Sequence, residues 1–480
     1  MIKEKPFIHL FETRGGYYIY DVNTNAILSV NKMIYELLQT DDLNIKEIGS
    51  DFDTINAMRA DGFLSTRRLK KIIHPDNDVL EYYLDRKLNM ITLQITQNCN
   101  LRCSYCVYSG KYQNREHSNK KMSIDVAKKG IDFLINHSSD SDEIGIGFYG
   151  GEPLLEFEMI KECIEYAEKR AEGKNLILSL TVNGTLLNGE IADYFQKHRI
   201  YTMVSLDGPK EVHDKNRKFS DGRGSFDVIY NNLKMLKDKC PEFMNKVGFS
   251  VVLDPQIDFG CLNEFLLNSD IFDDAYWINM SYVNQNYIKN EVDVQVDYNY
   301  KRKYELFKVY LSKLGKLDEK YISRVINKEY FDLKRLMSDE RALSKELPEK
   351  GHHAGPCIPG RQRLFLNVNG DFYPCERVSE SSEMTKIGNI ETGFDIDKVR
   401  KLLNIGCLNA DNCKNCWAFK YCTLCATHAD NLTDLSRDKI NSWCNISRKY
   451  VDDMLKNYCS LVELGHNFDN DITIMDYYKR

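Results

Sequence analysis

Hydrophobic runs of strand length alternate with helical patterns through the middle of the chain. Six runs are short, rich in β-branched and aromatic residues, and bounded by glycine or polar residues. They span residues 89–96, 143–149, 176–182, 201–206, 247–253 and 275–283. Between them, apolar residues recur at helical spacing in residues 123–136, 156–172, 189–197, 226–239 and 262–267. These strand–helix repeats predict an α/β domain with a parallel sheet or an incomplete barrel.

Residues 1–80 show a different pattern. Three β-prone runs, at residues 7–12, 17–21 and 26–30, are separated by turn residues, and helical patterns follow at 33–38 and 54–60. Short strands followed by a few helices predict a winged-helix-like module. Such a module binds DNA, for which this segment has no concentrated basic face, or a peptide that adds a strand to an exposed sheet edge.

The second half of the chain changes character twice. Residues 300–345 are charged and helical, with Tyr304, Phe307, Tyr310 and Leu311 at the spacing of a core-facing stripe. From Gly351 onward, periodicity weakens and cysteines become frequent, which is typical of a domain organised around metal clusters. We therefore predict a recognition module at 1–80, a core at 85–299, bridging helices at 300–350, a cysteine-rich domain at 351–460 and a tail at 461–480.

Composition narrows the class of protein. The chain has 480 residues, of which 42% are hydrophobic, and a formal net charge of −6. Its basic residues are scattered, which argues against nucleic acid as a partner. No apolar run approaches the roughly 18 residues that span a bilayer, and the first residues lack the apolar stretch of a secretory signal. We expect a soluble, cytoplasmic protein with no membrane partner.

The chain is rich in cysteine, with 15 residues of this type. In a large chain without a secretory signal, this number favours metal or redox chemistry over a disulfide framework. Cys163, Cys240 and Cys261 stand apart from any motif, and we interpret them as small buried apolar residues. Cys459 also lies outside the motifs and is interpreted as structural.

Cys99, Cys103 and Cys106 have the spacing C-x3-C-x2-C directly after the first predicted core strand. Three thiolates at this spacing can hold three irons of a cubane [4Fe–4S] cluster and leave the fourth iron open. A zinc site is the alternative, but structural zinc needs four closed ligands and no local histidine or cysteine supplies the fourth.

Glycines and polar residues end the next predicted strands. They are Gly150, Gly151, Glu152 and Pro153 after the second strand, Asn183 after the third, and Ser205 and then Arg217 after the fourth. Paired glycines let a ligand approach the backbone. Because the carboxyl ends of parallel strands meet at one mouth of such a fold, we expect these residues to converge there.

Seven more cysteines form an array in the last quarter of the chain. They are Cys357, Cys375, Cys413, Cys416, Cys422, Cys425 and Cys444. On spacing alone this array could hold two zinc ions. Cys407 lies nearby and is predicted to be a free buried thiol. His352 and His353 could ligate metal, but we interpret them as a solvated pair in a loop.

The first cysteine motif and the strand ends resemble the radical S-adenosylmethionine superfamily over roughly residues 85–300. The resemblance implies a partial (β/α)6 barrel in which S-adenosylmethionine chelates the open iron and is cleaved to a 5′-deoxyadenosyl radical. It also implies an electron donor such as flavodoxin or ferredoxin. The cofactor-binding residues it implies are Gly150, Gly151 and Glu152 at the amino group, Ser205 at the ribose or carboxylate, Arg217 at the carboxylate and Tyr105 near the adenine, together with Pro153 and Asn183.

The second array resembles the SPASM extension of that superfamily, which holds two auxiliary [4Fe–4S] clusters. By that resemblance one cluster has the full ligand set Cys413, Cys416, Cys422 and Cys444. The other has Cys357, Cys375 and Cys425, with an open iron unless Cys407 supplies a fourth ligand. An open iron could deprotonate a substrate thiol or accept an electron.

Glu376, next to Cys375, is a candidate catalytic proton acceptor, although a surface glutamate without a special role is the alternative. Sulfatase-maturing relatives usually place aspartate there, which counts mildly against their substrate.

The order of the three modules resembles maturases of ribosomally made peptides. In sactipeptide and ranthipeptide synthases the N-terminal unit binds the leader segment of a precursor peptide, and the enzyme joins cysteine sulfur to a carbon of another residue. The expected function is therefore thioether formation in a Cys-rich precursor peptide. The alternatives are a formylglycine-forming enzyme of the anaerobic sulfatase-maturating type and a non-enzymatic iron–sulfur regulator that binds DNA.

Overall fold

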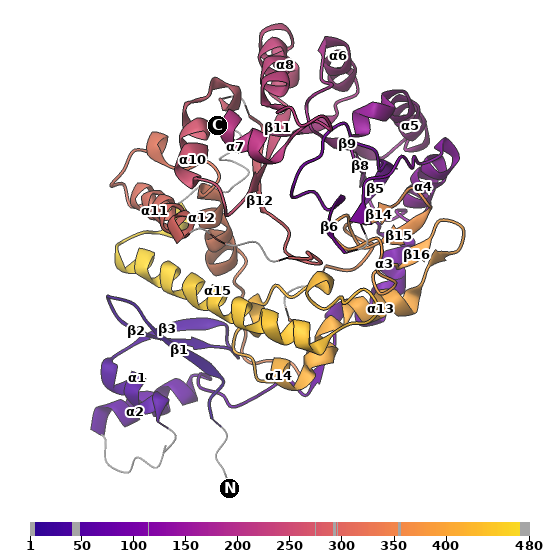
Figure 1. Cartoon of the computed structure of the whole chain (residues 1–480). Coiled ribbons are helices and arrows are strands. Elements are labelled where there is room, and N and C mark those ends of the chain that lie inside the picture. Colours follow the sequence, from indigo (N-terminus) through magenta and orange to yellow (C-terminus); the bar gives the residue numbers. More distant parts are fainter. Residues whose placement is uncertain are drawn as a thin grey trace.

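The computed structural model describes residues 5–40, 49–113, 115–273, 275–290, 294, 296–353 and 357–470. Its largest feature is a ten-stranded sheet with the order β12-β11-β10-β9-β8-β5-β14-β15-β16-β17 (Figure 1). The strands from β12 to β5 are parallel. They are β5 Met90–Thr96, β8 Glu143–Gly150, β9 Asn175–Val182, β10 Tyr201–Ser205, β11 Val247–Leu253 and β12 Trp277–Tyr282. The predicted α/β fold is confirmed, and its strands match the predicted runs.

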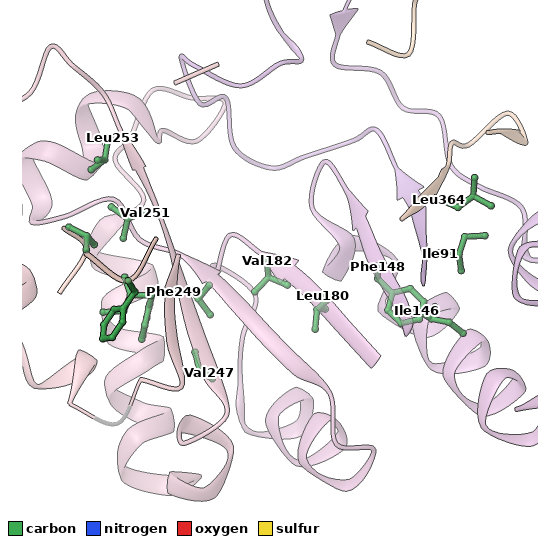
Figure 2. Close-up of a cluster of buried hydrophobic side chains, with 14 of the residues drawn as sticks. Ile91, Ile146, Phe148, Leu180, Val182, Val247, Phe249, Val251, Leu253 and Leu364 are labelled. Carbon is green, nitrogen blue, oxygen red and sulfur yellow. The ribbon is translucent and has the colours of Figure 1, made fainter. Parts of the chain in front are cut away.

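Helices cover the outer face of this curved sheet (Figure 1). They are α4 Ile124–Asn136, α5 Phe157–Arg170, α6 Gly189–Lys197, α8 Phe226–Lys239 and α10 Phe259–Asn268. Ser123 caps α4 and Asn188 caps α6 by accepting a hydrogen bond from a first-turn amide. Alternate strand residues such as Ile146, Phe148 and Val182 are buried in the core (Figure 2).

The cysteine-rich region extends the same sheet. β14 Leu364–Leu366 runs parallel to β5, with Leu364 beside Ile91 and Leu366 beside Leu93. β15 Asp371–Tyr373, β16 Gly388–Asn389 and β17 Gly393–Phe394 then continue it as an antiparallel meander. The weak periodicity after Gly351 therefore hides strands that are too short to show a pattern of their own.

The N-terminal residues form a separate small sheet. β1 Ile8–Glu12, β2 Tyr17–Asp21 and β3 Ala26–Val30 are antiparallel neighbours, as the three predicted runs required. α1 Lys32–Gln39 and α2 Gly49–Ala60 follow. This unit has its own cluster of buried residues, which are Ile19, Ile34, Leu37, Ile55 and Leu64.

The bridging segment consists of α11 Val296–Lys313 and α12 Asn327–Lys334. The prediction that Tyr304 and Phe307 face the core is wrong, because their side chains are 61% and 55% exposed. α11 instead buries the face that carries Tyr298 and Val309.

The C-terminal region contains α13 Ile396–Leu403, α14 Ala410–Lys414 and the 27-residue α15 Arg437–Glu463. Cysteine and charged residues interrupt the apolar pattern of α15, which is why the sequence did not predict it. α15 lies between the N-terminal sheet and the barrel (Figure 1). The other short elements include β4 Lys71–Ile72, α3 Leu80–Arg86, β6 Ser109–Tyr112, β7 Arg115–Glu116, α7 Lys210–Asn216, α9 Pro241–Met244 and β13 Lys350–Gly351.

Two of the isolated cysteines differ from the prediction. Cys163 in α5 and Cys459 in α15 are buried, as expected. Cys240 is half-buried and Cys261 is exposed, because Cys261 lies on the outward face of α10. Among the described helices, none is long and apolar enough to cross a bilayer.

His352 and His353 are buried, so the prediction of a solvated pair is wrong. Gly406 N donates to His352 Nε2 over 2.9 Å, and His353 Nε2 donates to Leu424 O over 2.8 Å. A side chain at Gly406 would place its Cβ 2.7 Å from His352 Nε2, so glycine leaves the room that the ring occupies.

These histidines make stability depend on pH. Burial lowers the pKa of His352 to about 3 and that of His353 to about 4, from 6.5. As the pH falls below about 6.5, the unfolded chain takes up protons first, and stability is lost until the folded pKa is reached. We expect His353 alone to lower the free energy of unfolding by about 2 kcal/mol at pH 5 relative to pH 7. His353→Gln should therefore narrow the difference in Tm between these two pH values. Tm curves for variant and wild type that fall in parallel would contradict this.

Candidate functional site

The first cysteine cluster lies in the loop after β5, at the carboxyl end of the parallel strands. Cys103 is buried, and Cys99 and Cys106 are half-buried. Leu101 N donates to Cys99 Sγ over 3.3 Å, and Tyr108 N donates to Cys106 Sγ over 3.5 Å. Amides aimed at sulfur stabilise a thiolate in this loop.

The chemistry of this donor set fits a metal cluster. Burial raises the pKa of Cys99 to about 11 and that of Cys103 to about 12, so these thiols ionise at neutral pH only when metal replaces the proton. Among the described residues, no three His, Cys, Asp or Glu side chains converge tightly enough for one metal ion. In a cubane each thiolate binds a different iron, so the thiols of a cluster site stand farther apart than those around one ion.

Gly150 and Gly151 allow β8 to pack against the cluster loop. A Cβ at Gly150 would lie 2.1 Å from Thr96 O, and one at Gly151 would lie 2.0 Å from Asn98 O. Gly151 N also donates to Thr96 O over 2.8 Å. Both positions therefore need glycine because the backbone of the cluster loop leaves no room for a Cβ. This reason adds to the predicted approach of a ligand.

Gly151→Ala should therefore displace the loop that carries Cys99. We expect purified Gly151→Ala protein to lose about four iron atoms, the content of one [4Fe–4S] cluster, and to stop cleaving S-adenosylmethionine. Iron analysis and assay of 5′-deoxyadenosine measure both effects. Gly189→Ala is the matched control, because open space surrounds Gly189 at the start of α6. Full iron and normal cleavage in Gly151→Ala would contradict this account.

Glu152 is completely buried and holds two strand ends together. Its Oε2 accepts from Asn183 N over 2.7 Å and its Oε1 accepts from Leu154 N over 3.0 Å. Burial raises the pKa of Glu152 to about 7, against the lowering effect of these hydrogen bonds. Pro153 follows as the first residue of a short 3-10 turn.

Asn183 links β9 to the cluster loop. Its Nδ2 donates to Asn100 Oδ1 over 2.8 Å and lies 3.9 Å from Cys99 Sγ. Ser205 is buried at the end of β10, beside Ser250 of β11. The structure thus gathers the predicted strand-end residues on the side of the sheet that carries the cluster loop.

Arg217 forms a buried ion pair that the sequence reasoning missed. Its Nε donates to Asp207 Oδ2 over 2.8 Å, and its Nη1 lies 3.9 Å from Cys103 Sγ. The Tyr105 hydroxyl also donates to Asp207, and the guanidinium lies 5.4 Å from the centre of the Tyr105 ring. Burial opposes ionisation of Asp207, but Arg217 and these hydrogen bonds hold its pKa below the usual range. The position of Asp207, directly after a strand end, was the available signal.

A second buried network joins the cluster loop to the cysteine-rich region. Gln94 Nε2 donates to Tyr108 Oη over 2.6 Å and to Glu380 Oε1 over 3.0 Å. The Tyr108 hydroxyl donates to Glu380 as well. Arg115 Nη2 completes the network with a 3.0 Å ion pair to Glu380. No sequence motif connects these four residues, which come from β5, the loop, β7 and the segment after Cys375.

Cys357, Cys375 and Cys425 lie close enough to act on one another. Burial raises the pKa of Cys375 to about 12, and Glu376, Cys425 and Cys357 add to the effect. Tyr149 at the end of β8 and Cys375 both pack against the same buried cluster, which consists of Phe365, Tyr373 and Val378. Burial is the main cause of the raised pKa of Tyr149, and Glu376 and Cys106 raise it further, so both charges act on this side chain.

Glu376 is mostly buried. Its Oε1 accepts from Arg363 Nη1 over 2.7 Å, whereas its buried Oε2 has no hydrogen-bond partner among the described residues. Glu376 Oε2 is therefore a buried carboxylate oxygen whose hydrogen-bonding capacity is unused among the described residues.

The remaining cysteines form a second set. Burial raises the pKa of Cys413 to about 12, and Cys416, Cys422, Cys444 and Cys407 raise it further. Cys407 is exposed and donates to Ile72 O over 3.0 Å, so the prediction of a buried thiol is wrong. Its effect on Cys413 places it near this set. Asn409 Nδ2 lies 3.7 Å from Cys444 Sγ.

Comparison with known proteins identifies the domain. Residues 93–258 match the model of the Radical SAM superfamily. A cysteine-type anaerobic sulfatase-maturating enzyme of Clostridium novyi is 33% identical over 154 residues, which are 32% of this chain and 41% of the relative. The radical SAM cyclopropyl synthase TigE of Paramaledivibacter caminithermalis is 22% identical over 351 residues, 70% of this chain and 67% of the relative. The chain thus matches about two-fifths of the length of the sulfatase-maturating relative.

A solved structure shares the fold. Native anSMEcpe with bound AdoMet superposes with a TM-score of 0.58 at 17% identity, over 80% of this chain and all of that chain. The same enzyme with a bound Kp18Cys peptide gives a TM-score of 0.58 at 18% identity, over 80% of this chain and 99% of that chain.

Proposed function

We propose that this chain, whose residues 93–258 are a radical SAM domain, is a maturase that forms thioether links in a ribosomally made, Cys-rich precursor peptide. A radical SAM domain implies S-adenosylmethionine and a [4Fe–4S] cluster, for which Cys99, Cys103 and Cys106 are the ligands. When bound there, the cofactor would supply a 5′-deoxyadenosyl radical that takes a hydrogen atom from the substrate.

The observation that carries the proposal is the group Cys357, Cys375 and Cys425 beside Tyr149. These thiols act on one another, and Tyr149 is within electrostatic reach of both Cys106 and the Cys375 segment. Cys407, the cysteine that the sequence offers as a possible fourth ligand, instead affects the pKa of Cys413 in the other set. A three-cysteine auxiliary cluster with an open iron is suited to hold the thiolate of a substrate cysteine.

The residues of this chain then have distinct tasks. Arg217, Asp207 and Tyr105 form a buried frame that fixes the cluster loop around Cys103. The free Oε2 of Glu376 takes the thiol proton of the substrate cysteine. Formation of one C–S bond breaks one C–H and one S–H bond and leaves one surplus electron. Glu376 would take the S–H proton; when bound, S-adenosylmethionine would supply the acceptor of the hydrogen atom, and the cluster held by Cys357, Cys375 and Cys425 would supply the acceptor of the electron. The strongly reducing conditions that such clusters need favour the cytoplasm and a flavodoxin or ferredoxin as electron donor.

The test is anaerobic co-expression with a Cys-rich peptide encoded beside the gene, followed by mass measurement before and after thiol alkylation. We expect loss of two hydrogens for each link and an equal loss of alkylatable thiols. Glu376→Gln should lower the number of links while 5′-deoxyadenosine is still formed. An unmodified peptide together with abundant 5′-deoxyadenosine would reject the thioether assignment.

The match to the Clostridium novyi enzyme favours one other reaction, oxidation of a sulfatase cysteine to formylglycine. A sulfatase-derived peptide tested in the same assay separates the two. Formylglycine reacts with hydrazines, and a thioether does not. A non-enzymatic DNA-binding regulator would form no 5′-deoxyadenosine at all.

A further inference from the structure

The N-terminal sheet rests on the loop between Cys416 and Cys422. The His9 ring of β1 stacks on the Trp417 ring, with centroids 3.5 Å apart and planes inclined by 4°. Trp417 directly follows Cys416, one of the four cysteines of the second set. A stack of this kind is sensitive to displacements of less than a ring width.

The rest of the same loop makes polar contacts to the turn between β2 and β3. Lys420 Nζ donates to Asn23 O over 3.4 Å. The Tyr421 hydroxyl donates to Asn25 Oδ1 over 3.0 Å, and the buried Tyr20 hydroxyl donates to the same oxygen over 2.8 Å. One five-residue loop therefore touches both a strand and a turn of the N-terminal sheet.

α15 forms the second surface that the N-terminal sheet contacts. His9 Nε2 lies 2.8 Å from Asp452 Oδ1, and the Tyr18 hydroxyl donates to Glu463 Oε1 over 2.6 Å. The sheet lies along this helix in Figure 1. α15 also carries Cys444, about 12 Å before Asp452 at the helical rise per residue.

We infer that the cluster of Cys413, Cys416, Cys422 and Cys444 is a structural pin that holds the N-terminal recognition module in place. This inference rests on the proposed function in one respect, the second auxiliary cluster that the SPASM resemblance implies for these four cysteines. A cluster bound there joins the Cys416–Cys422 loop to α15, because the loop provides two ligands and α15 provides one. The N-terminal sheet sits across both surfaces, so a displacement of one surface against the other disturbs its seating. The β2–β3 turn is also held by hydrogen bonds of Asn23 and Asn25 to residues 342–347, so we expect loss of the cluster to loosen the sheet without releasing it.

The loop has little structure of its own to replace the cluster. Its one regular element is the 3-10 turn Phe419–Tyr421. Free energy of metal binding is folding free energy where a site is not otherwise ordered. Loss of the cluster therefore loosens the module, whereas the barrel, which is built from the large sheet, stays intact.

Hydrogen exchange in the full-length, anaerobically loaded protein tests the inference. Cys444→Ala removes one ligand and keeps a good helix former within α15. We expect amide exchange in β1–β3 to rise about tenfold, with unchanged protection in β5, β8 and β9. Trp417→Leu keeps all four cysteine ligands but removes the stack on His9. This variant should retain its full iron content and still show the same rise in amide exchange in β1–β3.

A matched control comes from the far side of the barrel. His198 resembles His9 in its contacts, with its ring 4.3 Å from that of Tyr194 and its Nδ1 2.8 Å from Glu168 Oε1. His198→Ala should leave exchange in β1–β3 unchanged, whereas His9→Ala should raise it.

Unchanged exchange in β1–β3 of a folded Cys444→Ala protein would overturn the inference. If that variant does not fold, unchanged exchange in Trp417→Leu would overturn it. If protein reconstituted with zinc shows the same amide protection in β1–β3 as protein with the iron–sulfur cluster, the assignment of an iron–sulfur cluster to this site would be overturned. The hydrogen-exchange experiment does not depend on peptide modification. If the wild-type module is protected as expected but no thioether product forms, only the proposed function is rejected, and the inference about the module stands.

Discussion

Alanine at Cys99, Cys103 or Cys106 should reduce formation of 5′-deoxyadenosine to the level without enzyme. Each thiolate would bind a different iron of the cluster, so loss of one removes the site at which S-adenosylmethionine is held and reduced. The measurement is chromatographic assay of 5′-deoxyadenosine in anaerobically purified protein with dithionite as reductant. Iron content should fall by about one cluster, because the auxiliary cysteines are untouched.

Cys163→Ala is the matched control for these variants. Cys163 is buried on the core-facing side of α5 and lies outside the two cysteine motifs of the sequence. Its replacement should lower stability modestly and leave 5′-deoxyadenosine formation at the wild-type rate. Cleavage that survives in Cys103→Ala would show that the radical cluster is not held where we place it.

Arg115→Met should be among the most destabilising single changes in the chain. Arg115 and Glu380 are 4% and 9% exposed, and removal of the cation leaves a buried carboxylate with the neutral donors Gln94 and Tyr108 but no opposite charge. We expect a loss of about 3–5 kcal/mol in the free energy of unfolding, measured by urea denaturation of the loaded protein. The double variant Arg115→Met/Glu380→Leu should recover part of this loss, because it buries no charge.

The exposed ion pair between Arg86 and Asp140, 2.8 Å long, provides the comparison. Arg86→Met should leave the urea midpoint within experimental error, since solvent screens the pair. If Arg115→Met also left the urea midpoint unchanged, the network of Tyr108 and Glu380 would not be a structural link between the two cysteine regions.

Much of the barrel could be predicted from sequence. β5 and β8 are buried on both faces and read as nearly continuous apolar runs, and β9 alternates between buried and less buried positions. The helix at Phe226–Lys239 ends at the residues that its pattern predicts. The predicted convergence of Asn183 and Glu152 also appears, through a direct hydrogen bond.

The parts that escaped prediction depend on contacts between distant segments. Glu380 meets Arg115 only because β14 and its neighbours continue the main sheet. His353 is buried by Leu424 O and Gly406, which lie far from it in sequence. In α11 the aromatic spacing was read correctly as helical, but spacing alone does not say which face is covered.

The position of β14 has a consequence for biosynthesis. β5, which leads into the cluster loop, is flanked by β8 on one side and by β14 on the other, so it is an interior strand only in the finished chain. Until the ribosome has released residue 366, one edge of β5 remains unpaired and open to association with other chains. A fragment that ends before β14 therefore exposes an apolar edge next to the cysteine motif. Both edges of β5 are therefore paired only after the first strand of the cysteine-rich region has been made.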